Sequence, residues 1–238
     1  MMAKLVLGDI DIDVIHKDIK NLHLSVHPPM GRVRIAAPSR MKLENIRLYA
    51  ISKLGWIKTQ RKQIREQRRE TPREYLERES HYVWGKRYLL RVIEQDAPPM
   101  IELKNRNLVL HVRPDTTPSK REQVIENWYR EQARTATALL IEKWQPILKV
   151  KASGFYVQRM KTRWGSCNTE ARTIRINTEL AKKDSVCLEY IVVHEMVHLL
   201  ERSHNERFRG FMDKYYPKWS RVRMQLNNSP LSHEAWGY

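Results

Sequence analysis

Short stretches in which apolar and polar residues alternate open the chain and predict a small β-sheet. Four segments have the length and pattern of strands: Lys4–Leu7, Asp11–His16, Leu22–Val26 and Arg32–Ala36. From Met41 to about Glu70 the apolar residues recur at helical spacing, which predicts one long helix. The first part of the chain therefore combines a small sheet with a helix.

A second group of strands and a second long helix follow. Segments His81–Trp84 and Arg87–Ile93 read as a hairpin that turns at Gly85, and Met100–Leu103 and Leu108–Val112 read as further strands. Residues Ser119–Trp144 have a helical pattern, and we expect Pro146 to stop this helix. Segments 155–158, 161–166 and 173–176 predict a third strand group, with a polar turn at residues 168–171. The order of elements predicts an α+β protein.

The apolar stretch from Val186 to Leu200 contains the pattern His-Glu-x-x-His, formed by His194, Glu195 and His198. Residues four apart on a helix lie on the same face, so both imidazoles can bind one ion. Burying these polar groups among apolar residues costs free energy unless they have a partner. Zinc accepts histidine nitrogens, and Glu195 can serve as general base toward a water that the metal activates. We therefore expect a hydrolase with one Zn²⁺ per chain.

A catalytic zinc site of this kind needs a third protein ligand, and His204 is the candidate that we favour. On an unbroken helix His204 would be rotated by about 240° from His198, so the helix must end between them. The segment from Ser203 to Glu206 reads as a capping box, which would start a new helix at His204. The alternative third ligands are the carboxylates of Asp213, Glu234 and Glu201.

Three segments resemble the YgjP-like metallopeptidase-type domain, a relative of the SprT and WLM zincins: HEMVHLLERSHNERF from His194, RMKTRWGSC from Arg159 and IRINTEL from Ile174. The resemblance covers Gly154–Tyr216. It implies a zincin-like catalytic core in which His194, His198 and His204 bind zinc and Glu195 is the catalytic carboxylate. Members are described as peptidases and as metal-dependent hydrolases, including nucleoside triphosphate pyrophosphohydrolases. We place an N-terminal β-rich region with a long helix at residues 1–116 and the zincin-like hydrolase domain at 117–238.

Composition adds information about partners and location. The 44 Lys and Arg residues exceed the 27 Asp and Glu residues, which gives a net charge of +17 and predicts attraction to polyanions such as nucleic acid or nucleotides. Two cysteines, Cys167 and Cys187, are too few for a disulfide framework and form no CxxC pair. The chain has no signal-peptide pattern and no apolar stretch of the roughly 20 residues that span a bilayer. A cytoplasmic protein without membrane contact is expected.

Basic residues occur in two groups. One lies between Lys53 and Arg91, where interleaved glutamates at helical spacing also fit a solvated helix face. The other lies on the predicted hairpin just before the metal helix and comprises Arg159, Lys161, Arg163, Arg172 and Arg175. This group either places positive charge beside the site or consists of exposed hairpin positions in a generally basic protein. Arg159, Arg163 and Trp164 are candidate contacts for substrate or transition state, although Trp164 and Gly165 also fit a packed aromatic residue and a close helix contact. Tyr156 and His233 are further candidates for stabilising an oxyanion.

Two enzymatic functions fit these patterns. A zinc peptidase is favoured by the motif, and a strand beside the site would pair with an extended peptide substrate. A metal-dependent nucleoside triphosphate pyrophosphohydrolase is favoured by the positive charge, although no Gly-rich phosphate loop is present. A nucleic-acid-binding module with a structural metal ranks third, because a closed structural site needs neither an open coordination position nor a glutamate like Glu195.

Overall fold

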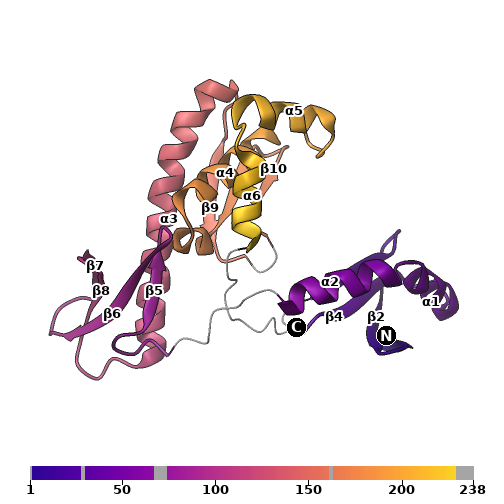
Figure 1. The fold of residues 1–238 in the computed structure, drawn as a ribbon, viewed down its shortest axis with the longest axis horizontal. Coiled ribbons are helices and arrows are strands. Elements are labelled where there is room, and N and C mark those ends of the chain that lie inside the picture. The colour runs from indigo at the N-terminus through magenta and orange to yellow at the C-terminus, as the bar shows by residue number, and fades with distance from the viewer. Residues whose placement is uncertain (1, 28–29, 67–73, 161–162, 229–238) are drawn as a thin grey trace. The chain divides into compact units, whose positions relative to one another are not determined.

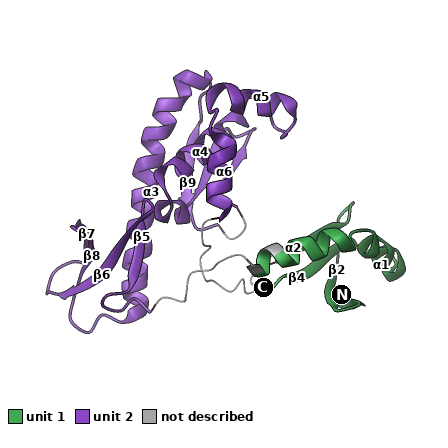
Figure 2. Cartoon of the chain, viewed as in Figure 1, with its two compact units in different colours: residues 1–72, 230–238 green, residues 73–229 purple. Residues whose placement is uncertain are grey.

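The computed structural model describes residues 2–27, 30–66, 74–160 and 163–228. Contacts divide the chain into two compact units, one of residues 1–72 with 230–238 and one of residues 73–229 (Figure 2). This division falls earlier than the boundary that we predicted between residues 116 and 117. Among the described residues, none of the helices combines the length and apolar character that crossing a membrane requires.

The first unit is the small sheet with its helices. Strands β1 (Met2–Leu7), β2 (Ile10–Lys17), β3 (His23–His27) and β4 (Arg32–Pro38) pair in the order β1-β2-β4-β3, with β2 and β4 parallel. Figure 1 labels β2 and β4 of this sheet. Alternate residues of β2, such as Ile10, Ile12 and Val14, are buried, as the alternation predicts. They share a core with Ile46 and Ile57 of the helices, so the sheet is covered on one face.

The long helix that we predicted from Met41 is two helices, α1 (Leu43–Ser52) and α2 (Leu54–Glu66). Lys53 leaves the helical conformation, with φ −103° and ψ 6°. The interruption lies beside Gly55, and glycine has the weakest helical preference after proline. The predicted continuation to Glu70 lies outside the described residues.

The second unit begins with a four-stranded sheet that packs on a long helix. Strands β5 (Ser80–Val83), β6 (Lys86–Glu94), β7 (Met100–Lys104) and β8 (Asn107–Val112) pair in the order β5-β6-β8-β7. The β5–β6 hairpin turns at Trp84 and Gly85, both with positive φ, as the tight hairpin turn requires. Side chains of this sheet share a core with Ile125 and Tyr129 of helix α3 (Pro118–Leu148). This shared core explains why the sheet groups with the later part of the chain.

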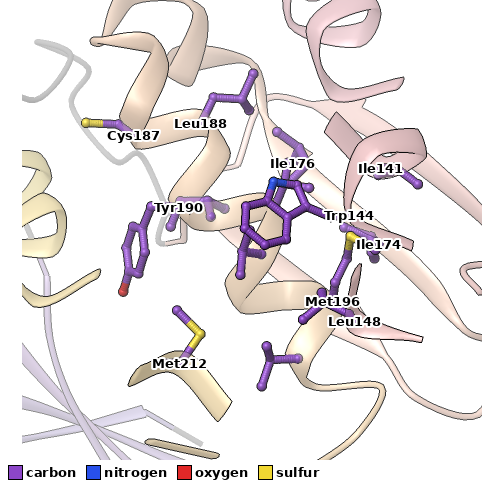
Figure 3. Packing of buried hydrophobic residues seen from close by; sticks show 14 of the residues in the cluster. Ile141, Trp144, Leu148, Ile174, Ile176, Cys187, Leu188, Tyr190, Met196 and Met212 are labelled. Carbon is purple, nitrogen blue, oxygen red and sulfur yellow. The ribbon is translucent and has the colours of Figure 1, made fainter. Parts of the chain in front are cut away.

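Helix α3 continues through Pro146, contrary to the predicted stop, and ends at Leu148. A proline so close to the C-terminus removes only one helical hydrogen bond. Trp144 and Leu148 on either side of it are buried in the core of the unit, which favours the helical continuation (Figure 3). Lys149 in the left-handed conformation then ends the helix.

The third sheet and the last helices form the remainder of the unit. Strands β9 (Gly154–Gln158), β10 (Gly165–Asn168) and β11 (Thr173–Asn177) pair in the order β10-β11-β9. The predicted strand at 161–166 starts only at Gly165, and residues 161–162 lie outside the described part. A 3-10 helix η1 (Thr178–Lys182) leads to α4 (Ser185–Val197), α5 (Glu206–Tyr215) and α6 (Trp219–Asn228). Residues Ile174, Ile176, Met196 and Met212 join sheet and helices in one core (Figure 3).

Between α4 and α5, the predicted end of the first helix is confirmed and the predicted start of the second is not. Helix α4 ends at Val197, before His204, as we predicted, and Asp184 caps its start. The capping box at Ser203 is wrong, because Asn205 caps α5 by accepting a hydrogen bond from the Phe208 amide at 3.0 Å. The amide of Ser203 instead donates to the carboxylate of Glu201.

Substitutions at Asn205 and Ser203 test which of these residues caps α5. Replacing a capping asparagine by alanine costs about 1 kcal/mol, which lowers the melting temperature of a protein of this size by about 2–4 °C. We expect this loss for Asn205→Ala and none for Ser203→Ala, measured by circular dichroism with a chelator present. Equal losses in the two variants would contradict the assignment of the cap.

Candidate metal centre

Three imidazoles converge at the end of α4. His194 lies in the last turn of this helix, His198 is the residue that follows its end, and His204 approaches them from the segment before α5. One ligand nitrogen from each ring lies within 4.8 Å of the other two, and the Nε2 atoms of His194 and His204 are 2.9 Å apart. The end of α4 at Val197 makes this possible, because the chain turns back toward the helix face. The structure thus brings together the three histidines that the sequence singles out.

The donor set has the chemistry of a zinc site. Nitrogens bound to tetrahedral zinc at about 2.0–2.1 Å lie about 3.3 Å apart. The nitrogens of His194 and His204 lie 2.9 Å apart, and all three ligand atoms lie within 4.8 Å of one another, so small shifts would bring them to this spacing. Nδ1 of His198 lies 3.1 Å from the Glu201 carbonyl oxygen, and donation to that oxygen leaves Nε2 of the ring as the free ligand atom. Burial, with added repulsion from His198, His204 and Arg223, lowers the pKa of His194 to about 3. His194 is therefore neutral near pH 7, which is the form that binds a metal.

The ring of Phe208 packs against all three histidines. Its ring centroid lies 4.9 Å from that of His194, 4.7 Å from that of His198 and 4.8 Å from that of His204. Phe208 is buried at the start of α5 and its amide donates to the Asn205 cap. Helical spacing in the sequence predicts that Phe208 is a core residue, and only the tertiary structure shows its contact with all three rings.

Glu195 is buried beside the histidines, with 6% of its surface exposed. Burial raises the pKa of its carboxyl to about 8, and the positive charge of Arg163 opposes this shift. The carboxylate lies directly against strand β10, because a Cβ placed on Gly165 would be only 2.7 Å from Glu195 Oε1. Gly165 is therefore the close helix contact that we considered from the sequence, and a larger residue there would force Glu195 or Ile191 to shift.

A cavity of about 730 Å³ opens over the histidines and Glu195. Strand β10 and the turn after it form one wall, with the side chains of Ser166, Cys167, Asn168, Thr169 and Glu170. Arg163, Arg175 and Arg202 also line the cavity. Arg163 was a candidate substrate contact, and Arg175 belongs to the same basic group of the sequence. The other lining residues were not candidates, because nothing in the sequence shows that the turn after β10 and the segment after α4 face each other.

The other two candidate contacts have different surroundings. Trp164 packs against the hydrophobic core and its carbonyl accepts a hydrogen bond from the Asn177 amide, which fits the packed aromatic residue. Arg159 lies near enough to Glu179 to help lower the pKa of that carboxyl. Neither residue is among those that line the cavity. A role in catalysis for either one stays a prediction.

Asn177 holds the segment that carries Arg163 to the cavity. Its Nδ2 donates to the carbonyl oxygens of Met160 and Arg163, each at 2.8 Å, and its Oδ1 accepts from the Met160 amide. Asn177 is almost fully buried at the end of β11. Sequence reasoning missed this residue, whose position at a strand end was the one available signal.

The alternative third ligands lie in other environments. Glu201 orients His198 through its backbone carbonyl, while its carboxylate accepts from the Ser203 amide. Asp213 accepts a hydrogen bond from the indole of Trp219 at 2.7 Å. Glu234 and the oxyanion candidate His233 lie outside the described residues. Tyr156 is exposed on β9, with the Arg175 guanidinium 5.9 Å from its ring centroid.

The other basic group of the sequence contributes to the first unit. Lys58, Arg61, Lys62 and Arg65 of α2 line a hollow of about 360 Å³ together with Asp9, which pairs with Arg61 at 3.6 Å. Several of these positive charges thus gather on one helix face. Binding of nucleic acid there stays a prediction, and Arg68 and Arg69 lie outside the described residues.

A histidine cluster beside a buried glutamate is typical of metal-dependent hydrolases. The model of the YgjP-like, metallopeptidase domain family matches residues 20–229, and the chain therefore belongs to that family. Family membership supports a metallopeptidase-like hydrolase. No curated protein matches the chain.

Two solved structures are similar to parts of the chain. The metallopeptidase zymogen jannalysin of Methanocaldococcus jannaschii is 20% identical, with a TM-score of 0.34, and the match covers 38% of this chain and 92% of jannalysin. The metallopeptidase zymogen abylysin of Pyrococcus abyssi is 18% identical, with a TM-score of 0.35, and the match covers 40% of this chain and 99% of abylysin.

Gly165 provides a test of the close contact with Glu195. An added methyl group at this position has no room, and overpacking of this kind costs about 1–3 kcal/mol. We expect Gly165→Ala to lower the melting temperature, whereas Gly154→Ala, where an added Cβ meets no atom within 4 Å, leaves it nearly unchanged. A Gly165→Ala protein as stable as the parent protein would show that the strand does not press on Glu195.

His204 provides a test of the metal ligands. Loss of a residue that hydrogen-bonds to a metal ligand typically lowers metal affinity roughly 10–100-fold. Loss of a ligand itself should lower the zinc affinity by more than this. We expect His204→Ala to show this loss in a competition titration against a chromogenic chelator. His23→Ala, which removes an exposed histidine of the first unit, is the matched control. Parental zinc affinity in His204→Ala would exclude this residue as a ligand.

Proposed function

We propose that the protein is a zinc-dependent metallopeptidase with an HExxH-x5-H site that cleaves peptide bonds. In this site His194, His198 and His204 hold the metal and Glu195 is the general base. One observation carries the proposal: three imidazole nitrogens converge beside a buried carboxylate on the wall of an open cavity. Membership in the YgjP-like metallopeptidase family supports the same class of reaction.

The chain's own residues divide the chemistry between them. A zinc ion held by the imidazoles would polarise the scissile carbonyl and acidify a bound water. Glu195 accepts the proton of the attacking water and returns it to the leaving amine. Burial raises the pKa of the Glu195 carboxyl to about 8, and the positive charge of Arg163 opposes this shift. A zinc ion bound at the histidines would favour the ionised carboxylate further. The carboxylate thereby has a pKa close to that of an efficient base.

Strand β10 offers a place for an extended peptide. It is an edge strand, since β11 is its one partner strand among the described residues. Its residues Ser166 to Asn168 line the same cavity as the histidines. An extended peptide that added to this edge would make backbone hydrogen bonds and pass close to Glu195. This arrangement supports a peptide substrate.

Hydrolysis of nucleoside triphosphates with release of pyrophosphate is the second candidate function. The arginines in the cavity favour it, since guanidinium groups bind phosphate well. A purely structural metal is less well supported, because structural zinc normally has four protein ligands and the cluster in the described residues has three.

Replacing Glu195 by glutamine tests the proposal directly. Removal of a general base lowers the rate by about 10²- to 10⁴-fold, and glutamine preserves the shape of the side chain. We expect zinc-loaded Glu195→Gln to lose cleavage of a mixed peptide pool to this degree while keeping its zinc. Cleavage is measured as amine release, and pyrophosphate release from nucleoside triphosphates is measured in parallel.

The matched control is Glu142→Gln, an exposed glutamate of α3, which should keep full activity. Chelation of the metal should abolish cleavage by the parent protein, and added zinc should restore it. Full peptide cleavage by Glu195→Gln would remove Glu195 from the mechanism. Pyrophosphate release without peptide cleavage would favour the second candidate function.

A further inference from the structure

Three arginines from separate segments line the cavity above the histidine cluster: Arg163, Arg175 and Arg202. Arg163 comes just before strand β10, and Asn177 fixes its backbone. Arg175 lies on β11 directly across from Ser166 of β10. Arg202 comes from the other wall, two residues before His204. Positive charge therefore reaches the cavity from both sides.

None of these three guanidinium groups forms an ion pair with a carboxylate in the described part of the chain. By contrast, other arginines of the protein have such partners, for example Arg32 with Asp13 and Arg121 with Glu94. Arg175 contacts a neutral ring, that of Tyr156, at 5.9 Å. Three guanidiniums without a carboxylate partner that face one cavity are arranged to receive negative charge from outside the chain.

The acidic residues of the cavity do not cancel this charge. Glu170 is the one exposed acidic residue among those that line it, and Glu195 is buried against Gly165. A cavity with an excess of one charge raises the local concentration of ligands of the opposite sign, to a degree that salt reduces. The cavity thus selects anionic groups close to the candidate metal.

We propose that the cavity selects peptide substrates with acidic side chains near the scissile bond, which Arg163, Arg175 and Arg202 bind. This inference rests on the proposed peptidase function and specifies its substrate class. The carboxylates belong to side chains of a peptide. The backbone of this peptide can form hydrogen bonds with the free edge of β10.

The lining of the cavity favours a peptide over a nucleotide. No phenylalanine, tyrosine or tryptophan is among the residues that line it. Phe208 is buried beneath the histidines and Trp164 packs against the core. A nucleobase normally gains affinity by stacking on an aromatic side chain, and the aromatic rings among the described cavity residues are the three imidazoles that we assign to the metal.

The test compares two peptide pools on the full-length, zinc-loaded protein. The pools have the same sequences except that glutamates flanking the scissile bond in one pool are glutamines in the other. We expect kcat/KM to be about tenfold higher for the glutamate pool at low salt, the effect of roughly one hydrogen bond between charged groups. Since the charges are partly exposed, the ratio should fall when salt rises from about 50 to about 300 mM.

Variants of the arginines test whether these residues cause the preference for the glutamate pool. Arg175→Gln and Arg202→Gln should each reduce the preference for the glutamate pool mainly by raising KM, and the double variant should abolish it. Both variants should still cleave the glutamine pool, which shows that they fold. Arg209→Gln removes the same charge from an exposed position of α5 outside the cavity and should keep the tenfold preference.

The outcomes separate this inference from the proposed function. Equal cleavage of the two pools, or a preference that survives the double variant, would overturn the acidic selection and leave the peptidase proposal intact. Cleavage of neither pool would overturn both. Pyrophosphate release from nucleoside triphosphates that depends on Arg175 and Arg202 would assign these arginines to phosphate and overturn the peptide substrate.

Discussion

The end of helix α4 at Val197 is the constraint on which the candidate centre depends. If the helix continued, His204 would face about 240° away from His198 and could not share an ion with it. The chain turns instead, the Glu201 carbonyl accepts from His198, and Asn205 starts the next helix. Phe208 then lies against all three imidazoles. The turn between α4 and α5 thus sets the positions of the metal ligands that we propose.

The opposite wall of the site depends on how closely strand β10 approaches α4. Gly165 lets the strand press on Glu195, and that contact helps to bury the carboxylate and raise its pKa. Asn177 holds the backbone at Arg163, whose charge opposes this shift. The properties of Glu195 therefore come from a strand and a loop as much as from its own helix. The same wall supplies the strand edge and two of the three arginines that line the cavity.

The sequence predicted regular elements well where hydrophobic periodicity was strong, and less well at their ends. The strands of the first sheet and the β5–β6 hairpin were confirmed, because alternation and turn residues specify them locally. The predicted helix break at Pro146 was wrong, since burial of Trp144 and Leu148 outweighs one lost hydrogen bond. The cap at Ser203 was wrong as well, because Asn205 competes for the same helix start. Such choices between neighbouring residues depend on packing.

By itself the sequence determined the composition of the candidate site: two histidines and a glutamate at helical spacing, a third histidine after a turn, and a basic chain. These follow from periodicity and charge, which a single segment reveals. Only the tertiary structure decided that Gly165 touches Glu195, that Asn177 holds Arg163, and that Arg175 and Arg202 face one cavity. The reason is physical: these contacts join segments that are distant in sequence, and the packing of a shared core, rather than any local pattern, brings them together.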